Sequence, residues 1–290
     1  MAASTTAGSV AVPLAPPARE GAAVRRPLDP RLYQIACLSA LFVYGLVWLD
    51  LEVRAGQATL LLATALGAQY TCTRLWRLPA FDPRSALISG LSLCLLLRTN
   101  SLSLAAAAAV VAVASKFVVR VRGKHVFNPT NLAIVAALLT GQAWVSPGQW
   151  GSAAFFGFLL ACLGGLVVHR AARSDVTLAF FAAYASLVVG RSLWLGEPMA
   201  IPLHRLENGA LLIFAFFMIS DPRTTPDARK ARIAFAVLVA LGAAYVQFRL
   251  FRTNGLLWSL ALLSPLVPLL DHLFPGPAHR WTPEPPRRSS

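Results

Sequence analysis

The sequence predicts an all-α integral membrane protein of about ten transmembrane helices. Of its 290 residues, 57% are hydrophobic and only 13% are charged, whereas soluble domains carry roughly 25% charged residues. A membrane-spanning helix needs about 20 apolar residues, so a chain of this length and composition has room for many spans. The distribution of its Lys and Arg residues, described below, supports ten.

The apolar residues fall into ten segments. Several are short or carry Gly, Ser and Thr, and the third and fifth are the weakest. We expect such short or interrupted helices to line a site where protein shields their irregular backbone. The ten segments are about 32 to 50, 56 to 76, 85 to 98, 102 to 119, 130 to 145, 150 to 169, 176 to 195, 207 to 220, 231 to 250 and 255 to 274.

Lys and Arg are unequally divided between the two sides of this predicted bundle. With the N-terminus inside, the inside loops and tails hold 20 Lys and Arg residues and the outside loops hold 6. Cytoplasmic loops of membrane proteins collect these residues, so we expect a multi-pass protein with both termini in the cytoplasm. The same rule, together with contacts to membrane lipid, explains the net charge of +14. We therefore predict no nucleic-acid partner.

The chain divides into one membrane domain and two tails. Residues 1–30 and 276–290 are rich in Pro and basic residues, a composition typical of disorder, and we expect disordered cytoplasmic tails around a membrane domain at 31–275. The four Cys residues lie singly inside apolar segments. Without paired spacing they predict no metal site.

A basic turn with the sequence "GKHVFNPTN" precedes the fifth segment. Asn128 before Pro129 is suited to cap a helix N-terminus. Free N–H groups at that terminus, with Arg122, Lys124 and His125 beside it, would suit an anion, and Asn131 adds an amide one turn into the helix. Two interpretations remain open from the residues alone: helix capping and ligand binding.

A second turn, "SDPRTTPD", follows the eighth segment. Asp221 precedes Pro222 as Asn128 precedes Pro129, and "TTPD" repeats the pattern before the ninth segment. Asp221 is expected either to cap or to contribute to a polar site at the mouth of the bundle.

Together the two turns, "SKFVVRVRGKHVFNPTNLAIV" and "FAFFMISDPRTTP", resemble the NqrB and RnfD family. These are membrane flavoprotein subunits of the sodium-pumping NADH:quinone oxidoreductase and of the Rnf ferredoxin:NAD complex. The resemblance implies a ten-helix fold, a bacterial inner membrane, other redox subunits as partners, and a flavin. It also implies that Arg122, Lys124 and His125 hold phosphate or a reduced flavin anion, that Asn128 and Asn131 orient the cofactor, and that Asp221 closes the pocket.

The sequence departs from the family at one motif. Members with covalent FMN attach it through a Thr in a Ser/Thr-Gly-Ala-Thr motif between the two turns, and "LLTGQAWVSPGQWGSAAFFGFLL" contains none. We therefore expect a non-covalent flavin, either FMN or riboflavin. As a short, divergent member, the chain is similar to the family's membrane proteins found beside enediyne biosynthesis genes.

Two functions follow from this resemblance. The first is a membrane electron-transport subunit, and so a part of a membrane oxidoreductase. The alternative is a transporter or accessory protein that keeps the fold without redox chemistry, which the missing threonine motif favours.

Overall fold

The computed structural model describes residues 29–48, 54–146 and 174–277, and these residues are mostly helical. A first group of helices comprises α1 (Pro30–Trp48), α2 (Ala55–Leu75), α3 (Arg84–Leu96), α4 (Leu102–Val118) and α5 (Pro129–Leu139). A second group comprises α7 (Ser174–Leu195), α8 (Ala200–Leu206), α9 (Gly209–Ile213), the π-helix η1 (Phe214–Met218), α10 (Arg229–Phe248), α11 (Gly255–Leu263) and α12 (Leu266–Leu273).

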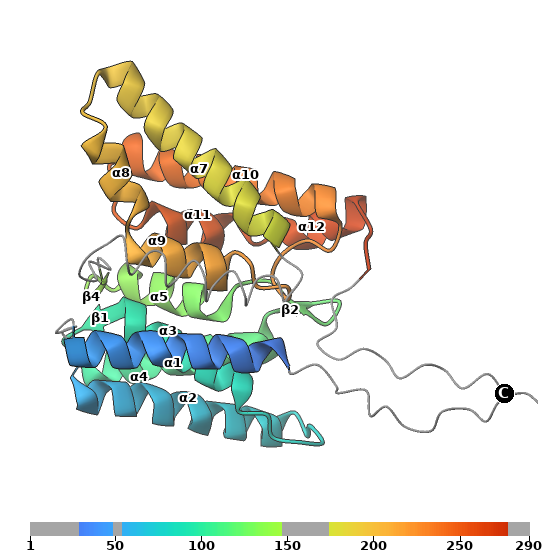
Figure 1. Cartoon of the computed structure of the whole chain (residues 1–290). Helices are drawn as coiled ribbons and strands as arrows, with labels where there is room; N and C mark the ends of the chain where they lie inside the picture. The colour runs from blue at the N-terminus through green and yellow to red at the C-terminus, as the bar shows by residue number, and fades with distance from the viewer. Residues whose placement is uncertain (1–28, 49–53, 147–173, 278–290) are drawn as a thin grey trace, which may run out of the picture.

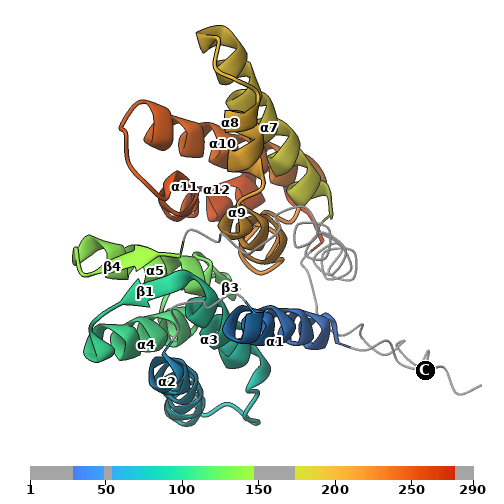
Figure 2. The same ribbon diagram turned by 60° about the vertical axis from the view of Figure 1, so that its left-hand side comes forward.

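The two groups lie one above the other, and α5 packs against both α4 and α11, so it joins them (Figures 1 and 2). The packing of α4 follows from its run of alanines. Ala105, Ala108, Ala109 and Ala112 are buried at helical spacing, and small side chains let the backbones of neighbouring membrane helices approach closely.

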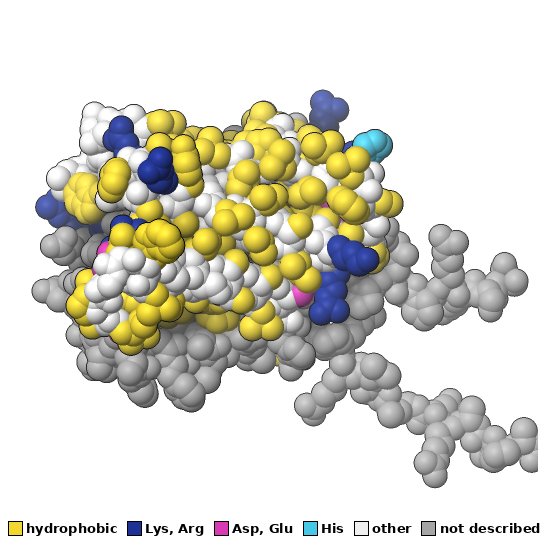
Figure 3. Space-filling view, turned by 90° about the horizontal axis from the view of Figure 1, so that it is seen from above, with side chains coloured by type: hydrophobic (Ala, Val, Ile, Leu, Met, Phe, Trp, Pro, Cys, Tyr) yellow, Lys and Arg dark blue, Asp and Glu magenta, His cyan; other side chains and the backbone are white. Residues whose placement is uncertain are grey.

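Among the described residues, three helices are long and apolar enough to cross a membrane: α1, α7 and α10. The pair α11 and α12, which bends by 52°, makes a fourth if it is one broken span. Hydrophobic side chains cover the middle of the face seen in Figure 3, and Lys and Arg lie toward its two ends. On α7, Leu178, Leu193 and Trp194 are exposed, which is the surface expected of a helix that faces lipid.

Nine of the ten predicted apolar segments contain a helix, and the sixth, 150 to 169, lies outside the described residues. Several boundaries were wrong. The fifth segment is helical only to Leu139, because Gly141 adopts φ +71° and a left-handed residue ends a helix. Ala143–Val145 then forms a strand, β4.

Two short ladders were not predicted. After α3, the strand β1 (Leu97–Thr99) pairs antiparallel with β4, so that Leu97 lies opposite Val145. This ladder satisfies backbone groups where two half-length helices end, as an apolar environment requires. The second ladder, formed by β2 (Arg120–Val121) and β3 (Lys124–His125), lies at the other end of the bundle (Figure 1).

The last helical segments are also broken. The predicted segment at 207 to 220 is α9 followed directly by η1, and the segment at 255 to 274 divides into α11 and α12 at Pro265, which cannot continue a helix interior. The start of α1 and the chain after α12 lie at the end of the bundle that carries β2 (Figure 1).

Candidate cofactor-binding site

A cavity of about 270 Å³ lies between the two groups of helices at the end that carries β2. We call it the first cavity. Three turns of similar sequence contribute to its wall: Asp82 before Pro83, Asn128 before Pro129, and Asp221 before Pro222. Its volume is close to the lower end of the range of ligand pockets, roughly 300–1,000 Å³.

Asn128 is a helix cap and a contact between the two groups. Its Oδ1 accepts a hydrogen bond from the N–H of Asn131 at 3.0 Å, and Pro129 occupies the first helical position. The predicted capping is confirmed. The Asn128 Nδ2 donates to the Met218 carbonyl at 3.3 Å, so the same side chain fixes the start of α5 against the end of η1.

Asp221 shapes the second turn in a related way. Its Oδ1 accepts from the Arg223 N–H at 2.9 Å, and its carbonyl accepts from the hydroxyl of Thr225 at 3.1 Å. Asp82 makes the same carboxylate contact with the Arg84 N–H at 3.1 Å. The two "DPR" turns thus have the same local structure and both line the first cavity.

His125 faces the first cavity from β3, opposite Arg120 in the ladder. Its Nδ1 is buried and has no hydrogen-bond partner among the described residues. Burial lowers the pKa of His125 to about 3, and the nearby cations Arg120, Arg223 and Lys116 act in the same direction. His125 is therefore a neutral imidazole at pH 7.

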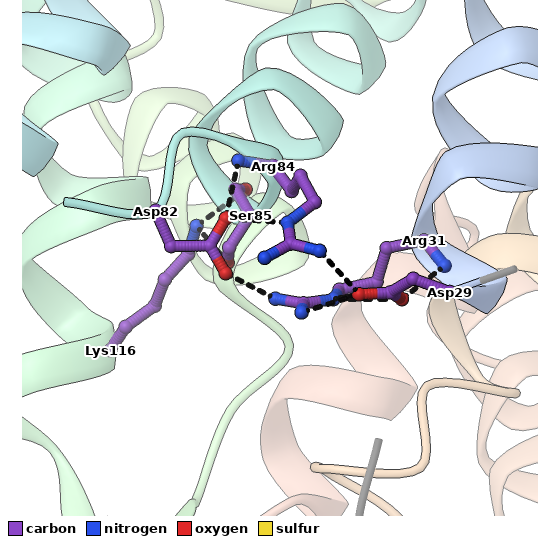
Figure 4. A network of polar contacts seen from close by, with 6 residues as sticks. All are labelled: Asp29, Arg31, Asp82, Arg84, Ser85 and Lys116. Atoms are coloured by element: carbon purple, nitrogen blue, oxygen red, sulfur yellow. Dashed lines mark hydrogen bonds and ion pairs between the residues drawn. The ribbon is translucent and has the colours of Figure 1, made fainter. Parts of the chain in front are cut away.

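Lys116, in the last turn of α4, lies in the wall of the first cavity. The side chain is buried, and its Nζ donates to the Ser85 carbonyl at 2.8 Å and to the Ser85 Oγ at 3.0 Å (Figure 4). Within the described part of the chain it forms no ion pair. A buried ammonium without a carboxylate contact favours an anionic neighbour.

Gln69, on α2, also lines the first cavity. It is 7% exposed, and its Oε1 has no hydrogen-bond partner in the described residues. Because burying an unpaired amide oxygen is costly, this oxygen is an acceptor suited to a ligand N–H or O–H. Sequence reasoning missed Gln69, since nothing in the α2 sequence marks the residue.

A network of ion pairs borders the cavity and ties α1 to α3 (Figure 4). Arg31 binds Asp29 at 2.6 Å and Asp82 at 2.7 Å, while Arg84 binds each of the same carboxylates at 2.8 Å. Although burial opposes the shift, hydrogen bonds and charge from the two arginines hold the pKa values of Asp29 and Asp82 below their usual range. Asp82 is thereby already neutralised by arginine.

The other predicted site residues lie elsewhere. Arg122 is exposed at the tip of the β2–β3 hairpin, where it and Gly123 have φ of 51° and 78°, as a two-residue type I′ turn requires. Lys124 binds Asp227 at 3.0 Å and Asp271 at 2.8 Å. Both Arg122 and Lys124 line a neighbouring cavity of about 410 Å³, the second cavity, whose wall His125 shares.

Asn131 is buried one turn below Asn128 and does not line either cavity. Its Nδ2 donates to the Leu257 carbonyl at 3.1 Å, which ties α5 to α11, and its Oδ1 has no partner in the described residues. The expected cap from "TTPD" is wrong: α10 begins after Ala228, which makes no side-chain cap. Asp227 instead accepts from Lys124.

Comparison with known proteins bears on what this site does. Residues 137–277 match the model of the NQR2, RnfD, RnfE family. The predicted resemblance to NqrB and RnfD is confirmed. The matched part contains the "SDPRTT" turn and begins after the "FNPTN" turn.

Curated relatives are named as a subunit of the ion-translocating oxidoreductase complex. The protein from Erwinia tasmaniensis is 28% identical over 147 residues, which are 50% of this chain and 38% of that protein. Those from Escherichia coli and Shigella boydii are 27% identical over 153 residues, 52% of this chain and 40% of each relative. The match thus spans about two fifths of the relatives' length. The chain is similar to membrane subunits of ion-translocating oxidoreductase complexes.

Proposed function

We propose that this protein is the flavin-binding membrane subunit of an electron-transfer complex and that it holds the flavin non-covalently in the first cavity. One observation carries the proposal. A polar, positively charged cavity is built from three Asp-Pro or Asn-Pro turns in a chain similar to a subunit of ion-translocating oxidoreductase complexes.

The groups that line the first cavity fit the polar edge of a flavin. Gln69 Oε1 is a buried acceptor without a partner in the described residues, and Lys116 Nζ is a buried donor with positive charge. His125 presents an unpaired ring nitrogen. The volume of about 270 Å³ suits a ring system and requires that any longer substituent leave through the mouth of the cavity.

A bound flavin would supply the redox chemistry by accepting and releasing electrons. Lys116 would neutralise negative charge that develops on a ligand in this low-dielectric region. Neutral His125 would accept or donate one hydrogen bond, and Gln69 would accept one. Asn128 and Asp221 hold the two turns that form the wall, so they position the site.

The topology belongs to the same proposal. We infer ten crossings over residues 31–275 in a bacterial inner membrane, with both termini in the cytoplasm and with membrane lipid and further redox subunits as partners. The described ends of the chain lie at one end of the bundle (Figure 1), as an even number of crossings requires. The predicted topology assigns several arginines to the opposite side of the membrane. Three of them lie at or just beyond the helix ends away from β2: Arg54, Arg98 and Arg249.

A transporter is the alternative, and one observation favours it. The half-length helices α3 and α5 begin at the first cavity and end in the β1–β4 ladder. Discontinuous helices whose N-termini face a cavity are typical of substrate sites in transporters. A transporter of this kind would need no flavin.

Purification in detergent with added FMN and riboflavin distinguishes the two functions. We expect a flavin absorption spectrum that stays with the folded protein and is released on denaturation. His125→Ala, in the wall of the first cavity, should lower the amount of bound flavin, whereas His272→Ala, on the exposed side of α12, should leave it unchanged. A folded protein that stays colourless would overturn the redox proposal and favour the transporter.

A further inference from the structure

Four cations line the first cavity, and Arg31 is paired with Asp29 and Asp82. The other three differ in burial and occupy two kinds of position. Lys116 is 5% exposed and lines the cavity together with Gln69, which is 7% exposed. Arg120 is exposed and Arg223 is partly exposed, and both also line the cavity. The two guanidinium groups therefore mark its mouth.

These three cations outnumber the carboxylates available to them. Two acidic residues line the cavity, Asp82 and Asp221, and Asp82 is bound by Arg31 and Arg84. Among the described residues, Lys116, Arg120 and Arg223 form no ion pair within 4 Å. Burial lowers the pKa of Arg223, and Arg120 and Arg31 lower it further against the opposite effect of Asp221. The mouth thus has an excess of positive charge.

The chemistry of the two positions differs. A guanidinium presents five donors in a planar fork that matches phosphate oxygens, while an ammonium acts as a point charge. Two arginines at the open mouth of the cavity suit a phosphate group that remains in contact with water. The single buried lysine suits a ligand group whose negative charge is delocalised, such as a ring.

We propose that the first cavity selects FMN over riboflavin, with Arg120 and Arg223 as the residues that bind the phosphate. This inference rests on the proposed function, because it requires that a flavin occupies the cavity. The predicted topology requires only that basic residues lie on this side of the membrane. The proposal gives Arg120 and Arg223 a further role, which is to bind the phosphate.

Titration of the flavin-free protein in detergent with FMN and with riboflavin, followed by quenching of flavin fluorescence, tests the proposal. Hydrogen bonds to charged groups change binding by about tenfold or more, so we expect a Kd for FMN at least about tenfold lower than that for riboflavin. Arg120→Gln and Arg223→Gln should each raise the Kd for FMN, and the double variant should bring it to the Kd for riboflavin. The Kd for riboflavin should stay the same.

Arg122→Gln is the matched control, since this arginine is exposed on the same hairpin as Arg120 and does not line the first cavity, whereas Arg223 lines both cavities. It should leave both constants unchanged. Arg223→Lys, which keeps the charge, should retain part of the preference for FMN. Equal affinity for the two flavins, or an equal loss of both in the Gln variants, would overturn this inference and leave the proposed function standing. Failure of both flavins to bind the folded protein would overturn the proposed function together with it.

Discussion

Two lysines, eight residues apart in the sequence, serve two adjacent cavities in different ways. Lys124 lies in the second cavity between Asp227 and Asp271, at 3.0 and 2.8 Å. Lys116 lies in the first cavity, buried, and its ammonium donates to two oxygens of Ser85 without an ion pair in the described part of the chain. Lys124 pairs with two carboxylates of its own protein and has a structural role. Lys116 feels the charge of Asp221 only at longer range, and we propose that its ammonium faces a ligand.

Lys116→Met gives the largest expected effect and would break this comparison directly. Removing one partner of a buried charge pair costs about 2–5 kcal/mol, so flavin affinity should fall roughly 30-fold or more. Equilibrium titration with FMN measures this loss. If Lys116→Met keeps the affinity of the unaltered protein, Lys116 is not the counter-charge and the two lysines do not differ in function.

Lys124→Met should show the opposite pattern. Its ion pairs are partly buried, because the side chains are 15–18% exposed. Their contribution to stability should therefore lie between that of surface ion pairs and that of fully buried ones. We expect a loss of about 2 kcal/mol in the free energy of unfolding, because two carboxylates lose their cation. Thermal unfolding in detergent measures the loss, and the Kd for FMN should stay within about twofold. A large drop in flavin affinity at full stability would return Lys124 to the ligand site.

Asn128 sharpens the comparison, because it lines the first cavity and not the second. Its side chain forms hydrogen bonds with backbone groups and carries no charge. Asn128→Ala removes the cap of α5 and the bond to the Met218 carbonyl, and should cost about 2 kcal/mol of unfolding free energy. Asn128→Ser keeps a capping oxygen and loses only the bond to the Met218 carbonyl, so it should cost about half as much. Equal stability of the two variants, measured by circular dichroism on heating, would contradict this assignment.

His125, in the wall shared by the two cavities, gives the smallest effect at pH 7, where its imidazole is largely neutral in both the folded and the unfolded state. Its pKa falls from 6.5 to about 3 on folding, so the folded state disfavours the protonated imidazole. The stabilisation that comes from the neutral form is complete above pH 6.5 and is lost as the pH falls toward 3, by at most about 1.4 kcal/mol per pH unit. His125→Gln should make the decline in thermal stability between pH 6.5 and 4 shallower. An identical decline would show that other groups cause it.

A good part of the site was predictable because local chemistry fixed it. Asn128 and Pro129 begin a helix wherever the chain places them, so the cap followed from the residues. The turn "FDPRSALI" at residues 81–88 resembles "FNPTNLAI" at 127–134, and this repeat is a signal that could have found the third wall of the first cavity. Gln69 gave no signal, because an amide within an apolar helix has the same local sequence whether it faces lipid, a neighbour or a cavity.

The sequence by itself determined the apolar segments, the alternation of basic loops, the capped turns and the family resemblance, because each depends on neighbours along the chain. Tertiary structure decided which cation is neutralised. Lys124 contacts carboxylates 103 and 147 residues away, whereas Lys116 forms no ion pair within 4 Å among the described residues and only the more distant Asp221 acts on its charge. Charge compensation depends on distance in space, and only the packing of α5 against both groups of helices brings these side chains together.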